Sequence, residues 1–302
     1  MRAACGRWIM LRKLIINADD FGLTSGINLA VSECAEAGLL RSATLMPNGE
    51  AFDDAVKTAK GQGGLRTGIH FALTGLKPVL AAGKLHGLAG EGGFLPSGPG
   101  GLLKKIAGRN SLRDDIRREL FAQAEKVFDS GLSVTHFDSH KHVHIIPVVL
   151  DIMIEIAGRF SVKAMRDPFE AEGAWRFFHD IEKNERIKFL KQYAVARASS
   201  FSRPQFMARV RKAGIQTPAV LYGISPTGFI NEKIIRRICG MLKAGISELM
   251  THPGIVDADL ECSKTRLLGS RAREKDLLMS TRVKELFERH QIILSHFGEV
   301  NQ

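Results

Sequence analysis

The chain alternates short apolar runs with amphipathic stretches over most of its length. Short apolar runs bounded by turn residues predict buried strands, whereas apolar residues three or four positions apart predict helices that cover a core. The runs predict strands at 13–18, 42–46, 67–71, 134–138, 162–166, 219–223, 248–251 and 292–295. Strands that alternate with helices pair in parallel, and seven or eight such units in 302 residues favour an α/β barrel over an open, doubly wound sheet. No glycine-rich GxGxxG turn follows the first strand, which weakens the nucleotide-binding alternative.

Helix signals and two irregular segments complete the expected organisation. Helices are predicted from about residue 26 to Gly38, from Ser111 to Gly131, and from Pro147 to about 158. Residues 80–110 are rich in glycine and proline and predict a long loop, and residues 169–216 predict a basic helical insertion. No linker or internal repeat divides the chain, so we expect one domain over residues 1–302.

Two adjacent carboxylates stand where the first strand ends. Asp19 and Asp20 follow an apolar run and stand three and two positions before Gly22. Neighbouring acids repel each other and are costly to bury together, so a cation is the usual reason for the arrangement. The alternative is a turn in which one acid caps the next helix, but that interpretation leaves the other acid unexplained.

Histidines occur at the predicted ends of three other strands. They are His70, the run from His136 to His144 with Asp138 inside it, and His252. The carboxyl ends of the strands of a parallel barrel converge on one face, so these residues can share one site. Asp20, His70 and His140 provide one carboxylate and two imidazoles, a donor set that suits zinc or another divalent ion. A single histidine on a strand is more often an ordinary core or surface residue, and Asp138 is a candidate for orienting a liganding imidazole.

The charge of the chain, +11 at pH 7, is concentrated in one region. Residues 183–212 contain nine lysines and arginines but one acid, Glu185, and aromatic residues are interleaved with them. Such a surface could face nucleic acid, an anionic membrane surface or an acidic ligand, although a solvated helical face that covers the barrel is the simpler interpretation. No nucleic-acid-binding motif accompanies the charge, so we expect no nucleic acid partner.

Cysteine usage and hydropathy indicate where the protein acts. The four cysteines lack metal-binding spacing and predict reduced thiols, no apolar run approaches the ~18 residues of a membrane span, and the N-terminus lacks a signal-peptide core. We therefore expect a cytoplasmic protein, and a homodimer by the base rates of soluble proteins.

Four motifs together resemble a known family. NADDFG, GIHFALT, DSHKHVH and ELMTHPG, in this order, resemble the YdjC-like carbohydrate deacetylases, which include chitooligosaccharide deacetylases, and the spacing of Arg266, Arg271 and Glu274 resembles the C-terminal region of that family. The resemblance implies a deformed (β/α) barrel and a divalent metal, zinc or magnesium, held by Asp20, His70 and His140. It further implies that Asp19 is the general base and His252 the acid.

The resemblance also leads to expectations about the substrate. The reaction it implies is hydrolysis of an N-acetyl group on an amino sugar, in an oligosaccharide or a glycolipid. The 169–216 insertion has no counterpart that we recognise in the oligosaccharide enzymes, and YdjC-like proteins also occur in hopanoid glycolipid biosynthesis. A basic, aromatic insertion would suit a lipid-linked substrate at the inner membrane surface.

Two residues near the strand ends are candidates for substrate binding. Arg166 ends a predicted strand and His144 lies in the loop after another. An ion pair with Asp167 or Glu170 is the alternative for Arg166. The rival functions are a metal-dependent phosphoesterase, which would need more carboxylates for its two or three ions, and a non-catalytic carbohydrate-binding protein.

Overall fold

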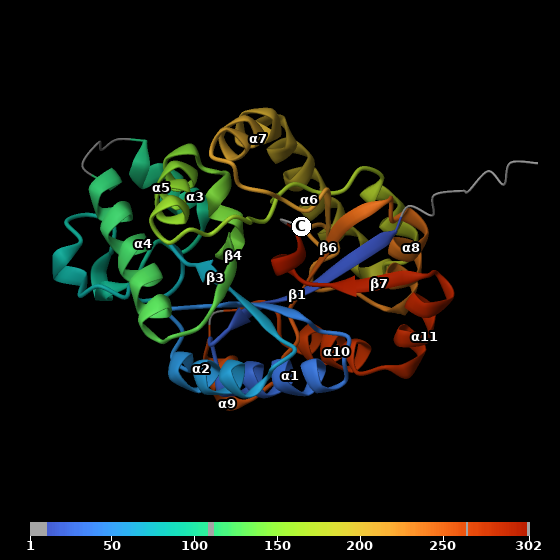
Figure 1. Ribbon diagram of the computed structural model, residues 1–302. Helices are drawn as coiled ribbons and strands as arrows, with labels where there is room; N and C mark the ends of the chain where they lie inside the picture. Colours follow the sequence, from blue (N-terminus) through green and yellow to red (C-terminus); the bar gives the residue numbers. More distant parts are fainter. Residues whose placement is uncertain (1–10, 108–111, 264, 301–302) are drawn as a thin grey trace, which may run out of the picture.

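A parallel sheet that curls into a deformed barrel organises the computed structural model, which describes residues 11–107, 112–263 and 265–300 (Figure 1). Within these residues the sheet has seven strands in the order β4-β3-β2-β1-β6-β5, with β7 paired to β1. The strands are β1 (Arg12–Phe21), β2 (Ser42–Leu45), β3 (Arg66–Phe71), β4 (Val134–Ser139), β5 (Val220–Tyr222), β6 (Gly245–Thr251) and β7 (Ile292–Ser295). Every pair is parallel, as the alternating pattern predicts.

The ten-residue strand β1 is the centre of the sheet. One edge of β1 pairs with β6 from Arg12 to Ala18. The other edge is shared, because β7 pairs with the first four residues of β1 and β2 pairs with its second half. The register with β2 shifts between Ala18 and Phe21, so the strand is irregular where the two acids stand.

The segment expected to form a strand at 162–166 closes the barrel by isolated bridges. Met165 bridges to Phe137 of β4, and Glu170 bridges to Leu221 of β5. The backbone therefore crosses from one end of the sheet to the other without forming a regular ladder. The predicted α/β deformed barrel is confirmed, and the prediction of a full strand at 162–166 is wrong because its backbone groups pair with different partners in turn.

Helices cover the outside of the curled sheet (Figure 1). They are α1 (Ser25–Glu36), α2 (Phe52–Gly61), α3 (Pro99–Ile106), α4 (Leu112–Asp129), α5 (Pro147–Arg159), α6 (Arg186–Ser199), α7 (Arg203–Lys212), α8 (Glu232–Met241), α9 (Ala258–Cys262), α10 (Gly269–Leu278) and α11 (Thr281–Arg289). Helix α1 begins after Thr24, whose hydroxyl accepts a bond from the Ile27 N–H, and ends before Gly38 in a left-handed conformation. None of the helices in the described residues is long and apolar enough to cross a membrane.

The two irregular segments differ in how far they match the sequence. The insertion at 169–216 is helical as predicted: two short 3₁₀ turns precede α6, and a third, Ser200–Ser202, joins α6 to α7. The segment at 80–110 is not a loop throughout, because α3 starts at Pro99 and buries Leu102. Proline at a first helical position favours helix formation, so the proline that indicated a loop instead begins a helix. The predicted helix start at Ser111 lies outside the described residues, as does Cys5.

The barrel interior is filled by a few apolar side chains near the amino ends of the strands. Ile15, Ala164 and Phe297 form this inner cluster, and the ring of His136 stacks on Phe297 with centroids 3.6 Å apart. Gly68 on β3 faces the same imidazole. A Cβ at Gly68 would lie 2.4 Å from Cε1 of His136, so the residue must be glycine for the two strands to pair.

We expect Gly68→Ala to lower the free energy of unfolding by about 1–3 kcal/mol, because the added methyl group overpacks the barrel interior. Urea denaturation measures the change. Gly158→Ala, in an exposed turn of α5 with no atom within 4 Å of the new Cβ, is the control and should stabilise by up to about 1 kcal/mol. Equal stability of both variants would show that the close approach of β3 and β4 does not constrain position 68.

Candidate active site

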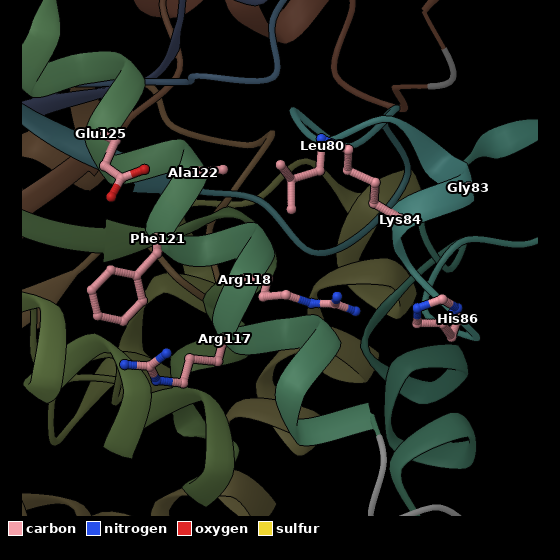
Figure 2. A pocket seen from close by; sticks show the side chains of 9 residues that line it. All are labelled: Leu80, Gly83, Lys84, His86, Arg117, Arg118, Phe121, Ala122 and Glu125. Carbon is pink, nitrogen blue, oxygen red and sulfur yellow. The ribbon is translucent and has the colours of Figure 1, made fainter.

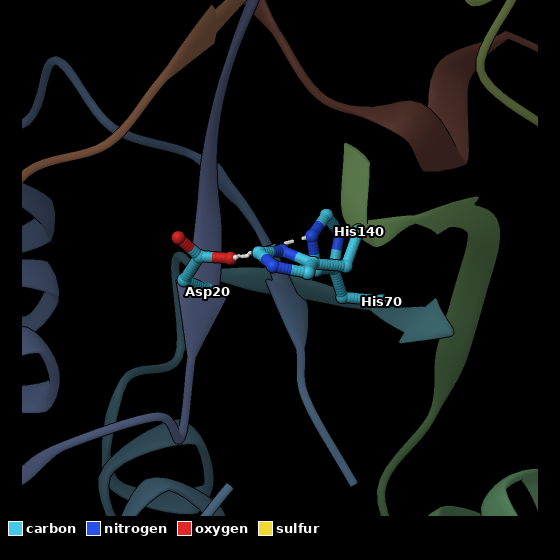
Figure 3. A group of neighbouring side chains, drawn as sticks. All are labelled: Asp20, His70 and His140. Atoms are coloured by element: carbon cyan, nitrogen blue, oxygen red, sulfur yellow. Dashed lines mark hydrogen bonds and ion pairs between the residues drawn. The ribbon is translucent and has the colours of Figure 1, made fainter. Parts of the chain in front are cut away.

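Three residues from separate strand ends meet around one carboxylate oxygen (Figure 3). Oδ1 of Asp20, at the end of β1, lies 3.0 Å from Nδ1 of His140 and 3.4 Å from Nε2 of His70. His70 belongs to β3, and His140 follows β4 directly. The structure thus brings together the three residues that the sequence indicated as metal ligands.

The backbone of Asp20 explains how two consecutive acids reach one site. Side chains alternate between the two faces of an extended strand, so Asp19 and Asp20 should point in opposite directions. Asp20 instead adopts a left-handed conformation with φ of +64°, which aspartate tolerates better than most residues. The break in alternation lets both carboxylates face the carboxyl rim of the barrel.

His70 is oriented by a second carboxylate. Its Nδ1 lies 2.7 Å from Oδ1 of Asp138 on β4, which leaves Nε2 directed toward Asp20. Burial opposes a positive charge on this ring, but Asp138 and the two neighbouring acids outweigh burial and raise the pKa of His70 to about 10. A carboxylate behind an imidazole is the arrangement that commonly fixes a metal-binding histidine.

The other oxygen of Asp20 is bound by an arginine. Arg271 of α10 donates to Oδ2 over 2.5 Å, and its charge, together with His140, holds the pKa of Asp20 well below its usual value against the opposing effect of burial. Oδ1 therefore remains for another partner. Because the donor atoms of Asp20, His70 and His140 all lie within 4.8 Å of one another, the residues fit a divalent ion.

Asp19 is held rigidly beside this group. Its two oxygens accept bonds from the guanidinium of Arg166 over 2.7 and 2.6 Å, and the Asn17 side chain donates a third bond. Burial would raise the pKa of Asp19, but Arg166 outweighs it and lowers the pKa, so the group is ionised. Asp19, His70 and Asp138 also form a cluster with donor atoms within 4.8 Å.

Arg166 lies beneath the site and has no exposed surface. Its guanidinium contacts three carboxylates: Asp19, Asp138 at 2.7 Å and Glu248 at 2.6 Å. The expectation that Arg166 binds substrate is therefore corrected, and so is the alternative ion pair with Asp167 or Glu170. The guanidinium already supplies a positive charge to the group formed by Asp19, His70 and Asp138, which we call the second carboxylate cluster.

His252 follows β6 at the same rim. Its backbone N–H donates to Glu274 of α10 over 2.7 Å, and its Nδ1 is buried without a hydrogen-bond partner among the described residues. Burial lowers the pKa of His252 to about 4, so the ring is neutral at pH 7. Burial also raises the pKa of Glu274 to about 7.

The turn after β4 places two further histidines differently. His144 is fully buried, with Nδ1 2.5 Å from the Ser139 hydroxyl and its ring beside Phe206 of α7, so the expectation that it binds substrate is corrected. His142 is half-buried and sits in a left-handed conformation that it shares with Lys141. Sequence reasoning did not select His142, although its alternation with His140 and His144 was the available signal.

Charged residues of the site affect the pKa of His142. Burial lowers its pKa to about 3, Arg166 adds to this effect, and the charges of Asp19, His70 and His252 also act on the ring. Non-glycine residues with positive φ are uncommon, and strained backbone of this kind is concentrated at functional sites. His142 follows His140 by two positions in the same turn and is therefore a further candidate for the site.

A separate hollow of about 520 Å³ lies between α4 and the segment around Gly83 (Figure 2). Two arginines that line it are already paired, Arg117 with Glu155 and Arg118 with Asp115. None of the residues of the carboxyl rim described above lines this hollow.

The chain is similar to a family of proteins over nearly its whole length. The family model of YdjC-like proteins matches residues 13–289. A carbohydrate deacetylase of Thermoanaerobacter pseudethanolicus is 28% identical and one of Brevibacillus brevis is 30% identical, each over 95% of this chain and 99% of the relative. A chitooligosaccharide deacetylase of Escherichia fergusonii is 37% identical over 51% of this chain and 58% of the relative.

A solved structure has a similar fold. It is described as a proposed cellobiose-phosphate cleavage protein from Enterococcus faecalis V583, with a TM-score of 0.77 and 23% identity over 95% of this chain and 98% of that one. At this identity the similarity concerns the fold alone.

We expect Arg166→Met to lower the free energy of unfolding by about 3–5 kcal/mol, because it leaves buried carboxylates without their cation. Arg209→Met removes a partly exposed ion pair with Asp151 and should cost less than about 1 kcal/mol. Urea denaturation of both variants gives the comparison. Similar losses would show that Arg166 is no more important to stability than a surface arginine.

We expect His136 to make the protein sensitive to acid. Burial, with Arg166, keeps the pKa of His136 well below the usual 6.5. Below about pH 6.5 the histidine of the unfolded chain therefore binds a proton, whereas the ring in the folded protein stays neutral. The neutral His136 ring therefore makes its full contribution to the free energy of unfolding above that pH, and the contribution falls as the pH decreases. His136→Asn should flatten the dependence of unfolding free energy on pH by up to about 1.4 kcal/mol per pH unit.

Urea denaturation between about pH 5.5 and about pH 7.5 measures this slope. Across this range the histidine of the unfolded chain changes from protonated to neutral, whereas the folded ring stays neutral. The exposed His86→Asn variant is the matched control. An unchanged slope in His136→Asn would contradict the assignment.

Proposed function

The chain belongs to the YdjC-like protein family, and from this premise we propose that it is a metal-dependent hydrolase that removes an N-acetyl group from an amino sugar. The observation that carries the proposal is the oxygen of Asp20 directed at both His70 and His140, with the ionised Asp19 beside them. The names of the deacetylase relatives support the same reaction. The substrate is an oligosaccharide or a glycolipid that carries the N-acetyl sugar.

Asp20, His70 and His140 would hold one divalent ion, zinc or magnesium. Such an ion polarises a bound carbonyl and lowers the pKa of a bound water from ~15.7 toward ~7. Asp138 keeps the His70 ring in the orientation that presents Nε2, and Arg271 leaves one oxygen of Asp20 for the ion. Binding would also require His70 to lose its proton.

Asp19 acts as the general base in this proposal. Arg166 grips both of its oxygens, which weakens the carboxylate as a base but fixes where it lies. Efficient proton transfer depends on position first and on pKa second, so a firmly held Asp19 fits the role of accepting a proton from water. Arg166 is then a positioning residue and does not touch the substrate.

His252 is the proposed acid that protonates the departing amine. Because its ring is neutral at pH 7, His252 must receive a proton during the reaction before it donates one. The charges of Asp19 and Asp20 both act on this ring, and its buried Nδ1 has no partner among the described residues. We propose that the proton taken up by Asp19 is the one that His252 delivers.

The charges at the site favour binding of a single metal ion. Many barrel phosphoesterases bind two or three. The second carboxylate cluster, which includes Asp19 and Asp138, already contains the cation of Arg166. A second divalent ion there would face a buried positive charge. Phosphate release from sugar phosphates without acetate release from N-acetyl sugars would favour the phosphoesterase, and binding without turnover would favour a carbohydrate-binding protein.

Two further expectations belong to this proposal. We propose a cytoplasmic enzyme, which the unpaired Cys34, Cys239 and Cys262 support because disulfides are rare in reducing compartments. We also propose a homodimer, on base rates alone.

We expect Asp19→Asn to keep the metal and to lose about 10²–10⁴-fold in turnover, because the amide cannot accept the water proton. His140→Ala should lose both metal and turnover, since an imidazole ligand is removed. Acetate release from N-acetyl oligosaccharides and N-acetylglucosaminyl lipids, with and without chelator, measures activity. Metal analysis of the purified variants measures occupancy.

Asp115→Asn is the matched control, because Asp115 is a buried acid that pairs with Arg118 on α4 away from the rim. It should keep near-wild-type turnover. Near-full activity of Asp19→Asn on a true substrate would overturn the base assignment, and activity unaffected by chelator would overturn the metal.

A further inference from the structure

Helix α6 has apolar residues on two opposite faces. Phe189 and Ala196 are buried against the molecule, and Tyr193 stacks beside Phe189. A helix on the surface of a globular protein normally has one apolar stripe, which faces the core. The second stripe of α6 faces away from the core.

This outer stripe is the most exposed apolar surface of the described residues. Phe201 is 89% exposed, Val195 71% and Ile187 68%, the three highest values among the large hydrophobic side chains, and Leu190 is exposed as well. Positions 187, 190, 194, 198 and 201 are three or four residues apart, so they share one face of the helix and of the turn that follows it. Val195 lies next to this row, eight positions after Ile187.

Basic side chains flank the outer stripe. Lys188, Lys191 and Arg197 are exposed, and none of them forms an ion pair within the described part of the chain. Other arginines of the insertion are neutralised, since Arg203 pairs with Asp167 and Arg209 with Asp151. We define the α6 surface as Ile187, Lys188, Leu190, Lys191, Val195, Arg197 and Phe201. It combines exposed apolar side chains with positive charges, of which Lys188 and Arg197 lie at the sides and Lys191 lies between Ile187 and Val195, four positions from each.

The α6 surface lies at the same end of the barrel as the active site. Gln192 of α6 donates to the carbonyl oxygens of Ser225 and Thr227, which follow β5, and Phe206 of α7 packs near His144, which follows β4. These anchors are at the carboxyl ends of the strands, where Asp20 and His70 also lie. In Figure 1, α6 and α7 are on the side opposite to α1 and α2.

We infer that the α6 surface docks on the surface of an anionic phospholipid bilayer. A helix with an apolar face and lysine or arginine at its sides lies in the plane of the bilayer interface, with its apolar residues at the acyl boundary and its charges at the headgroups. Docking in this way brings the carboxyl rim of the barrel toward the lipid. The inference adds a membrane partner to the proposed deacetylase, but docking itself does not depend on catalysis and can be tested without substrate.

Two other occupants fit the α6 surface less well. In a two-fold symmetric dimer the same patch faces itself, so Lys188, Lys191 and Arg197 would meet their own copies with no acid among them. Nucleic acid would use the charges, but single strands bind by stacking successive bases on aromatic rings. Phe201 is the one aromatic ring of the α6 surface, and Ile187, Leu190 and Val195 are aliphatic.

Co-sedimentation with vesicles tests the inference on the full chain without substrate. We expect binding to vesicles of equal parts phosphatidylglycerol and phosphatidylcholine, weaker binding to phosphatidylcholine alone, and partial loss in high salt, which screens the lysines. Ile187→Ser with Phe201→Ser should weaken the partition by about tenfold or more. Lys188→Glu with Lys191→Glu should remove the preference for the anionic vesicles.

Leu29→Ser with Lys57→Glu is the matched control, because it removes an exposed apolar residue and a lysine from α1 and α2. It should bind vesicles like the wild type. All three double variants should release acetate from a soluble N-acetyl oligosaccharide at the wild-type rate. Acetate release without vesicle binding would overturn the docking alone. Vesicle binding without acetate release from either the oligosaccharide or an N-acetylglucosaminyl lipid would overturn the proposed function alone.

Three other outcomes would overturn the inference. The first is equal binding of the wild type and the α6 variants to anionic vesicles. The second is a dimer in light scattering that Ile187→Ser with Phe201→Ser dissociates, with no vesicle binding. The third is retention of RNA that Lys188→Glu with Lys191→Glu abolishes, again with no vesicle binding.

Discussion

The neutralisation of buried carboxylates by Arg166 is the constraint on which the carboxyl rim depends. Asp19, Asp138 and Glu248 come from β1, β4 and β6, and one fully buried guanidinium joins them. Several charges out of water are stable together only if each is paired and hydrogen-bonded. The arginine therefore fixes the distance between strands on opposite sides of the barrel, and it also places the proposed base next to the proposed metal ligands.

The same constraint gives two adjacent acids different roles. Asp19 has both oxygens bound by Arg166, whereas Asp20 has one oxygen bound by Arg271 and the other directed at two imidazoles. The left-handed backbone of Asp20 makes this division possible, because a regular strand would turn one of the acids away. A pair that resembles two equivalent ligands in the sequence is thus one base and one ligand in our proposal.

The insertion is coupled to the active site by its anchors. The chain that crosses between β4 and β5 contains Arg166 at one end and leads directly into the insertion, whose α7 packs beside His144. His144 belongs to the turn that starts at His140, so α7 packs against the same turn that contains a proposed metal ligand. The proposed docking surface and the candidate active site are in this way connected by side-chain contacts at the same rim.

The sequence by itself determined the parallel α/β architecture, the strand ends at which acids and histidines stand, and the helical insertion with its charge. These features follow from local periodicity and from turn residues, which short stretches of chain encode. Only the tertiary structure decided the partners of Arg166, the burial of His144, the place of His142 and the second apolar face of α6. Arg166 and Asp19 are 147 positions apart, and their contact depends on the curl and register of the whole sheet, which no local pattern specifies.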